Sequence, residues 1–190
     1  LSNVEETLKK ATIMIENGAE WLDIGGESTR PGAEIIDTDE EIRRILPIIR
    51  AVRDKFPNVG ISIDTRRASV AELALDEGAD MINDVSALSD PRMLEVIKSR
   101  KCPICIMHMK GLPENMQNNP KYGDVVAEVK QVLAEKIKIL IDAGIKPNQI
   151  IGDPGIGFGK LLEHNIALLS AGRDVIPIQN IGLMWGVSRK

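Results

Sequence analysis

The sequence lacks several features that are typical of nucleic-acid-binding, membrane or secreted proteins. It has no surplus of positive charge, since 24 Lys and Arg stand against 28 Asp and Glu, and a basic face for nucleic acid is therefore not expected. No apolar run approaches the roughly 18 residues that a membrane span requires. The first ten residues, LSNVEETLKK, lack the apolar centre of a secretory signal. We therefore expect a cytoplasmic globular protein without nucleic-acid or membrane partners.

Cysteine and histidine are also scarce, with two residues of each. Cys102 and Cys105 open an apolar run that resembles a strand, whereas a redox C-x-x-C pair lies at a helix N-terminus. Residues three apart on a strand point to opposite faces, so we expect two buried thiols and no disulfide. His108 has no second ligand three or four residues away, so a zinc site is not expected.

The glycine-rich stretch IIGDPGIGFGK, residues 150–160, lacks the spacing of a nucleotide-binding loop. A P-loop needs a glycine at the position of Pro154 and a hydroxyl at the position of Leu161. The dinucleotide fingerprint needs a glycine at the position of Lys160 or Leu162. The stretch is therefore interpreted as a strand, an acid and an open glycine loop, with Lys160 near the start of the next helix.

Apolar-periodic segments alternate with short apolar strands along the chain. Helices are expected at about 2–17, 38–55, 69–77, 90–98, 124–143 and 165–171. Strands are expected at about 21–26, 60–64, 81–85, 103–108, 149–153 and 181–187. The spacing Ser/Thr-x-x-Glu predicts N-caps at Ser2, Thr38 and Ser69. This alternation predicts a parallel sheet.

Polar residues end five different strands, which favours one of two parallel folds. These residues are Asp23, Asp64, Asn83, His108 and Asp153. A barrel builds its site from many strand ends, whereas a doubly wound sheet concentrates its site at one switch point. We therefore predict an α/β fold, a (β/α)8 TIM barrel, forming a single domain over residues 1–190. Only about six βα units are present, so we expect the barrel to be incomplete, without its first and last strands.

Three of the strand-end residues form a set with a distinct chemistry. Asp64 and Asp153 are carboxylates that accept hydrogen bonds, and the Asn83 amide both donates and accepts. This combination suits a flat heterocycle edged with N–H groups. A second polar loop, GESTRPG at residues 26–32, contains Arg30, which could bind an anion with two hydrogen bonds.

Six stretches taken together resemble the dihydropteroate synthase family, in order and across the whole chain. They are DIGGESTRPGA, ISIDT, INDVSAL, IMHMKGLPENMQ, DPGIGFGK and GVSRK. The resemblance implies a (β/α)8 barrel acting in folate synthesis. It also implies a reaction that joins 6-hydroxymethyl-7,8-dihydropterin diphosphate to p-aminobenzoate and releases diphosphate. Sulfonamides are then expected to compete for the p-aminobenzoate site.

The same resemblance assigns a substrate side to the candidate residues. It implies that the pterin is bound by Asp64, Asn83, Asp153 and Lys190, with Met107 as a wall of the pocket.

The resemblance also assigns residues to the diphosphate and p-aminobenzoate side of the site and to catalysis. The resemblance implies that Thr29, Arg30 and Phe158 lie on the diphosphate and p-aminobenzoate side. The catalytic residues are then Lys190, Arg30 and Asp153. A dissociative reaction is implied, in which fixed carboxylates stabilise a pterin cation after diphosphate has left.

The cofactor and some of the anion-binding residues are expected outside the chain. The resemblance implies Mg²⁺, bound by a family asparagine that would lie upstream of Leu1, so no metal ligand is expected in this sequence. An R-x-H motif for diphosphate would lie beyond Lys190. We therefore expect the 190 residues alone to be inactive, and we expect a homodimer of the whole protein.

Two other interpretations remain open. One is a methyltetrahydrofolate-binding methyltransferase domain, which shares the barrel and a similar acid and amide set. The ESTRPG loop and the SRK segment favour the synthase. The other is a pterin-binding paralogue without catalytic activity, which would have lost the diphosphate site.

Overall fold

The computed structural model of the protein describes residues 4–28, 34–111, 116–117, 119–176 and 178–188. Helices and strands alternate through this part of the chain. The strands are β1 (Trp21–Gly25), β2 (Gly60–Asp64), β3 (Met81–Asp84), β4 (Ile104–Met107), β5 (Ile150–Asp153) and β6 (Gly182–Leu183). The helices are α1 (Val4–Glu16), α2 (Thr38–Lys55), α3 (Ala68–Asp76), α4 (Met93–Arg100), α5 (Val125–Asp142) and α6 (Leu162–Ala171), with 3-10 turns η1 (Pro147–Gln149) and η2 (Gly172–Val175).

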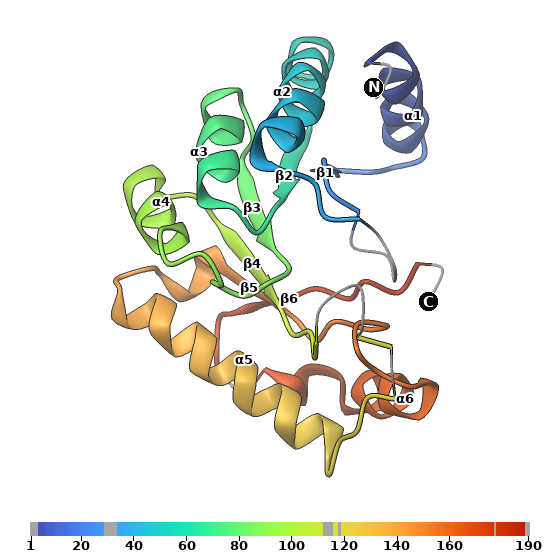
Figure 1. Ribbon diagram of the computed structural model, residues 1–190, viewed down its shortest axis with the longest axis vertical. Coiled ribbons are helices and arrows are strands. Elements are labelled where there is room, and N and C mark those ends of the chain that lie inside the picture. The colour runs from blue at the N-terminus through green and yellow to red at the C-terminus, as the bar shows by residue number, and fades with distance from the viewer. Residues whose placement is uncertain (1–3, 29–33, 112–115, 118, 177, 189–190) are drawn as a thin grey trace.

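The strands form one parallel sheet in the order β1-β2-β3-β4-β5-β6, which is also their order in the chain. A doubly wound sheet would reverse its strand order at a switch point, and this sheet does not. The helices lie outside the curved sheet (Figure 1). The predicted fold is confirmed: it is an incomplete (β/α)8 barrel, with six strands among the described residues.

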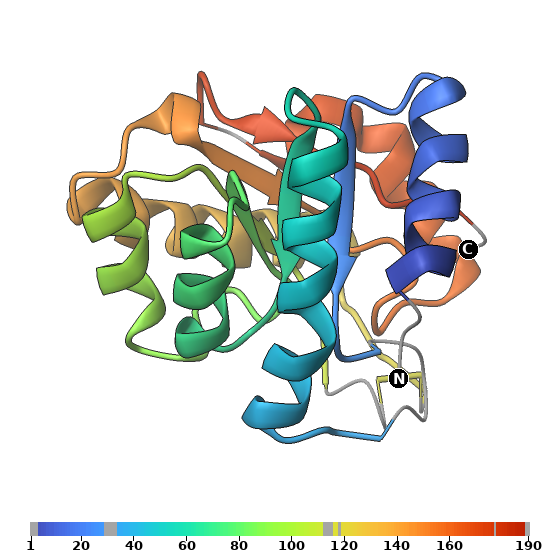
Figure 2. The ribbon, with the colours of Figure 1, turned by 90° about the horizontal axis from the view of Figure 1, so that it is seen from above.

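The core lies between the sheet and the helices that cover its outer face. Strands β3 and β4 are buried at every position, as expected for parallel strands covered on both sides. Helix α5 buries residues three or four apart, namely Val125, Val129, Leu133, Ile137 and Leu140, which is the period of one helix face. Helices α1, α2, α3 and α4 stand side by side along the sheet (Figure 2).

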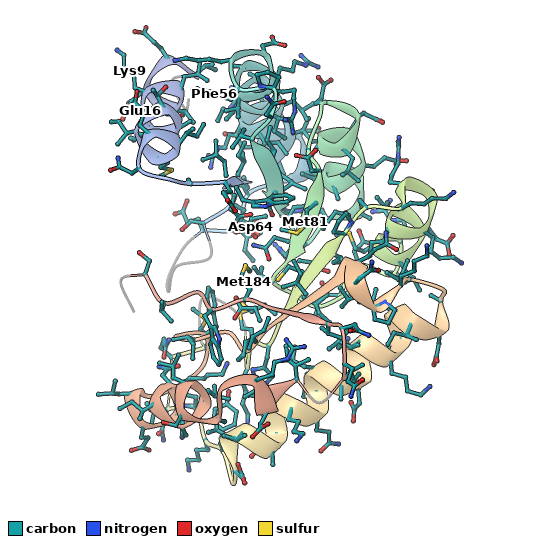
Figure 3. All side chains as sticks on the ribbon, turned by 180° about the vertical axis from the view of Figure 1, so that it is seen from behind. Lys9, Glu16, Phe56, Asp64, Met81 and Met184 are labelled. Carbon is teal, nitrogen blue, oxygen red and sulfur yellow. The ribbon has the colours of Figure 1, made fainter. Side chains whose placement is uncertain are left out.

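The strand register aligns the polar ends of neighbouring strands. Asp64 of β2 is paired with Asn83 of β3, and Met107 of β4 is paired with Asp153 of β5. Asp64 and Met184, the latter just after β6, lie toward the middle of the molecule (Figure 3). The register thus brings the sequence-predicted strand ends together at one end of the barrel.

Several predicted boundaries were wrong by a few residues. Helix α2 covers the predicted residues, but its N-cap is Asp37, whose side chain accepts a hydrogen bond from the Glu40 amide. Helix α6 begins at Leu162, three residues before the prediction. The last strand contains only Gly182 and Leu183.

The described residues also bear on the two cysteines and on membrane-spanning helices. Cys102 and Cys105 are both buried free thiols. Burial raises the pKa of Cys102 to about 11, so this thiol is not activated as a nucleophile. Among the described helices, none is long and apolar enough to cross a membrane.

Candidate functional site

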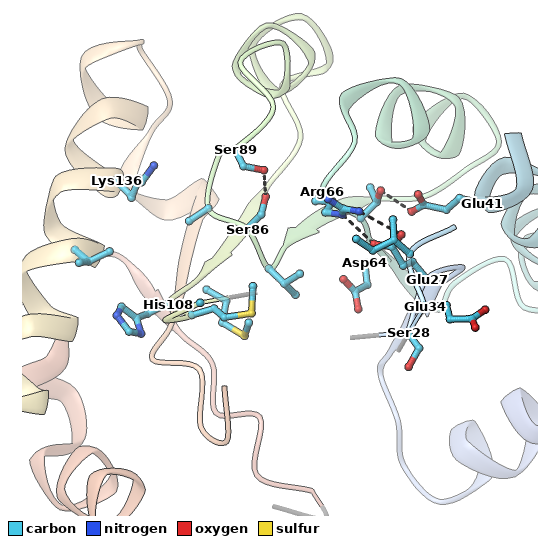
Figure 4. Close-up of a pocket in the computed structure, with 18 residues that line it drawn as sticks. Glu27, Ser28, Glu34, Glu41, Asp64, Arg66, Ser86, Ser89, His108 and Lys136 are labelled. Carbon is cyan, nitrogen blue, oxygen red and sulfur yellow. Dashed lines mark hydrogen bonds and ion pairs between the residues drawn. The ribbon is translucent and has the colours of Figure 1, made fainter. Parts of the chain in front are cut away.

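A cavity of about 290 Å³ opens at the carboxyl ends of the first four strands. Its lining includes Glu27 after β1, Asp64 at the end of β2, and Met107 at the end of β4. Figure 4 shows Asp64 on one side of the cavity and His108 on the other. Barrel active sites are built at this end of the sheet, so the cavity is the candidate site.

Asp64 lies in an acidic part of this cavity. Burial raises the pKa of its carboxyl well above the ordinary value, and the nearby charges of Asp23 and Glu41 raise it further. A strongly shifted group in a cleft is a candidate for function. The Asp64 carboxyl is therefore set to meet a ligand that donates hydrogen bonds or carries positive charge.

Asn83 stands beside Asp64 and is oriented by an acid of the neighbouring part of the sheet, Asp23 of β1. Its amide nitrogen donates to the Asp23 carboxylate over 3.1 Å. The pKa of Asp23 is raised, chiefly because the surrounding protein removes part of the hydration of its carboxyl. The Asn83 side-chain oxygen is buried and has no hydrogen-bond partner among the described residues. Because buried polar atoms are almost always paired, this oxygen is suited to accept a hydrogen bond from a bound ligand.

Asp153 at the end of β5 is buried, and its carboxylate is held by the glycine loop. The carboxylate Oδ1 accepts a 2.7 Å hydrogen bond from the Gly155 amide. A Cβ added at Gly186 would lie 3.6 Å from the Asp153 Oδ2, so the chain after β6 approaches the other oxygen. Phe158 in the same loop is partly exposed, and its amide donates to the Gly155 carbonyl.

The sequence-predicted residues are partly brought together. Asp64 and Met107 line the cavity. Asn83 and Asp153 are their register partners on the next strands but are not part of its lining. Phe158 lies in the loop after β5, also outside the lining. Thr29, Arg30 and Lys190 lie outside the residues that the structure describes.

The sequence did not predict a network of charged and hydrogen-bonding side chains at the rim of the cavity, which we call the rim network. Its members are Glu27, Glu41, Thr65, Arg66 and Arg67. Arg66 and Arg67 each donate to the Glu27 carboxylate over 2.9 Å. Burial raises the pKa of Glu27, but these hydrogen bonds and charges outweigh it and leave the pKa below its ordinary value.

The buried end of the rim network is Glu41 of α2. Its carboxylate accepts a hydrogen bond from the Thr65 hydroxyl over 2.7 Å and pairs with Arg67. Arg67 also donates to the Ile36 carbonyl over 2.6 Å. The only sequence signal was the pair of adjacent arginines after β2, and nothing in the sequence identified their partners.

No described group of three or more His, Cys, Asp or Glu side chains is arranged to hold a metal ion. The acids near the cavity instead have protein partners. Glu27 is bound by arginines, and Asp84 accepts from the Ser86 and Leu88 amides. The described residues therefore do not fit a metal site.

A model of the pterin binding enzyme family matches residues 1–190 of the chain. The chain is similar to the dihydropteroate synthase of Synechocystis, with 44% identity over 100% of this chain and 65% of that protein. A Yersinia pestis dihydropteroate synthase solved with a sulfonamide drug superposes with a TM-score of 0.94 and 39% identity, covering 100% of this chain and 68% of that one.

A third relative was also solved with a bound small molecule. The Burkholderia cenocepacia dihydropteroate synthase complexed with 7,8-dihydropteroate superposes with a TM-score of 0.88 and 41% identity, covering 98% of this chain and 68% of that one. The chain thus spans about two thirds of the length of these relatives, and 65% of the Synechocystis protein.

Proposed function

The chain belongs to the pterin binding enzyme family, and on this basis we propose that it is the greater part of a dihydropteroate synthase. The proposed reaction joins 6-hydroxymethyl-7,8-dihydropterin diphosphate to p-aminobenzoate and releases diphosphate. Two relatives that match 100% and 97% of this chain carry this name, and the Burkholderia relative was solved with 7,8-dihydropteroate. Sulfonamides are proposed as competing ligands because the Yersinia relative was solved with one.

One observation carries the proposal: the buried Asn83 oxygen without a described partner, beside the Asp64 carboxyl at the cavity. The proposal is that both accept hydrogen bonds from one edge of the bound ligand. A pterin ring carries N–H groups along one edge, which such acceptors can bind. Asp153, held in place by the Gly155 amide, is proposed as a third acceptor.

The second substrate is proposed to bind on the side of the glycine loop. Phe158 is partly exposed there and could pack against an aromatic ring. Thr29 and Arg30 are proposed to complete this side, and Lys190 is proposed to bind the pterin. Lys190, Arg30 and Asp153 are the proposed catalytic residues. These three assignments rest on the resemblance of their motifs to the family.

The acids would act on the pterin through their charge. When diphosphate leaves, positive charge develops on the ring, and fixed carboxylates stabilise it. Asp23, Asp64 and Asp84 lie close enough for the Asp23 and Asp84 charges to raise the pKa of Asp64. Binding a cationic ring would relieve this mutual repulsion, which strengthens the interaction in the transition state.

Mg²⁺ is proposed to assist the departure of diphosphate, with ligands outside the described residues. No described cluster of His, Cys, Asp or Glu side chains fits a metal ion. A homodimer in the cytoplasm is proposed for the whole protein.

The test uses the full-length protein with both substrates and Mg²⁺. We expect formation of 7,8-dihydropteroate and equal release of diphosphate, measured by chromatography and a coupled assay. Asp153→Asn should weaken pterin binding by about 1–3 kcal/mol, because an amide replaces a double acceptor.

Two outcomes would contradict the proposal. Pterin binding without turnover indicates the non-catalytic paralogue. Methyl transfer from methyltetrahydrofolate, without condensation, indicates the methyltransferase. Unchanged calorimetric affinity of Asp153→Asn for the pterin removes that residue from the site.

A further inference from the structure

Lys160, at the end of the glycine loop, is a buried cation that none of the proposed catalytic steps uses. Only 3% of its surface is exposed. Its ammonium donates to the carbonyls of Gly155 over 2.9 Å and Phe158 over 3.0 Å. It also lies 2.9 Å from Nδ1 of His108 and 3.2 Å from the His108 carbonyl. A buried ammonium requires such partners because its desolvation is otherwise costly.

The geometry of these contacts fixes the state of the imidazole. A lysine ammonium has three donors and no acceptor. Nδ1 of His108 must therefore accept, and the proton of the neutral ring lies on Nε2. Burial, and then the charge of Lys160, lowers the pKa of His108 to about 3.

The contacts of Lys160 join two strand ends that both contribute to the site. His108 follows β4, directly after the cavity residue Met107. Gly155 and Phe158 belong to the loop after β5. The two segments are in close backbone contact, because a Cβ added at Gly155 would lie 1.9 Å from the His108 carbonyl oxygen. Lys160 therefore fastens the glycine loop against the end of β4.

From Lys160 the contacts lead to Asp153 in two steps. Lys160 holds the Gly155 carbonyl, and the Gly155 amide holds the Asp153 carboxylate. The backbone of Asp153 is fixed by His108, which is another contact of Lys160. The Asp153 carbonyl accepts a hydrogen bond from the His108 amide over 2.9 Å. Loss of the ammonium would release the turn that orients this carboxylate.

We propose that Lys160 is a positioning residue, which holds the glycine loop in the form that orients Asp153 and Phe158 for the pterin and its partner. The proposal deepens the proposed function and rests on it for the identity of the ligand. It contradicts the interpretation of Lys160 as a helix-start lysine, because α6 begins two residues later and the ammonium faces inward.

The test compares Lys160→Met with Lys138→Met in the full-length protein. Methionine has a similar length and no donor, and Lys138 is an exposed lysine of α5 paired with Asp142. Amide hydrogen exchange of Gly157 and Phe158, measured by NMR without ligand, reports the loop. We expect Lys160→Met to exchange at least tenfold faster there, with unchanged exchange in α2 and α3. Lys138→Met should match the parent protein.

The second readout is calorimetric affinity for 7,8-dihydropteroate. We expect Lys160→Met to bind at least tenfold more weakly, and Lys138→Met to bind normally. A loop that exchanges as in the parent protein overturns the proposal, as does a loosened loop with normal affinity. If the parent protein itself fails to bind 7,8-dihydropteroate, the proposed function fails, and hydrogen exchange alone decides whether Lys160 fixes the loop.

A second pair of variants applies if Lys160→Met does not fold. His108→Leu removes one acceptor of the ammonium, and His108→Asn keeps an acceptor near the position of Nδ1. We expect faster loop exchange and weaker binding in His108→Leu, with recovery in His108→Asn. Equal behaviour of the two variants in both measurements contradicts the proposal.

Discussion

At the residue scale, Asp64 combines a proposed role in pterin binding with a cost in stability. Its carboxyl has a pKa well above the ordinary value, because of burial and of neighbouring acids. A raised pKa means that this group stabilises the fold at low pH, and that the stabilisation is lost as pH rises through the folded-state pKa. At pH 7, above the ordinary pKa of an aspartate, the burial of this carboxyl therefore weakens the ligand-free protein.

Asp64→Asn should separate these two effects. The amide cannot ionise and does not carry this cost, so we expect the Tm of the ligand-free protein at pH 7 to rise by about 2–4 °C, the shift that 1 kcal/mol produces in a domain of this size. Pterin affinity should fall by about 1–3 kcal/mol because an acceptor is lost. Scanning calorimetry and titration calorimetry measure the two quantities.

The control for Asp64→Asn is Asp142→Asn, because Asp142 at the end of α5 is exposed and is not part of the cavity lining. Its Tm and affinity should stay at the parent values. A lower Tm for Asp64→Asn would mean that burial of the carboxyl does not destabilise the protein. Unchanged pterin affinity would mean that Asp64 is not a ligand.

The lowered pKa of His108 makes the free energy of unfolding depend on pH. Its pKa is 6.5 in the unfolded chain and about 3 in the fold. Between these values the unfolded chain binds a proton that the fold does not, so stability falls as pH falls. From pH 7 to pH 5 the protein should lose about 2 kcal/mol more than His108→Asn does. Urea unfolding at both pH values measures the difference, and equal losses contradict the assignment.

The sequence identified the strand-end residues, but it could not identify how they are held. Asp64, Asn83 and Asp153 follow apolar strands, and the strand pattern alone puts them at one end of a barrel. Lys160 gave no such signal, since its partners are backbone carbonyls and a histidine 52 positions away. Contacts of this kind depend on the loop backbone, which a residue pattern does not specify.

At the element scale, the rim network ties three segments to each other. Arg67 precedes α3, Glu41 lies in α2, and Glu27 follows β1. Arg67 also binds the Ile36 carbonyl, and the Ile36 amide donates to Glu27. Both ends of the loop between Glu27 and Ile36, which carries Thr29 and Arg30, are therefore fixed by the same arginine.

Arg67→Met should destabilise the protein strongly. Glu41 is only 1% exposed, so removal of its cation leaves a buried carboxylate without a charge partner, which costs about 3–5 kcal/mol. Chemical denaturation at pH 7 measures the loss. The double variant with Glu41→Gln should recover part of it, because the unpaired charge is then gone.

Arg43→Met is the matched control, since Arg43 makes an exposed pair with Glu40. Its effect should stay within about 0.5 kcal/mol, as is usual for surface substitutions. An Arg67→Met protein as stable as Arg43→Met contradicts a structural role for the network.

Element types were easier to predict than element ends. Helix α2 was predicted from its apolar period, but its cap is Asp37 where a capping-box pattern indicated Thr38. Both residues are good N-caps, so the local sequence does not choose between them. The last strand was predicted seven residues long and contains two, because ladder length depends on the neighbouring strand and not on apolarity.

At the scale of the whole molecule, the strand order follows the chain order. The sequence favoured this barrel order over a doubly wound order through the spread of polar residues over five strand ends. The sequence pattern does not decide whether the sheet closes into a complete barrel. Strands β1 and β6 are the edges of the described sheet, and whether an edge is paired depends on residues elsewhere in the protein.

The last prediction concerns a polypeptide of these 190 residues alone. Helix α6 exposes Leu162 (75%), Ile166 (54%) and Leu169 (45%), spaced as one helix face. Open sheet edges and an exposed apolar face both promote self-association. We expect this polypeptide to bind a hydrophobic dye, to self-associate in light scattering, and to form no 7,8-dihydropteroate, whereas the full-length protein remains dispersed and active. Turnover by the 190-residue polypeptide would show that these 190 residues contain a complete site.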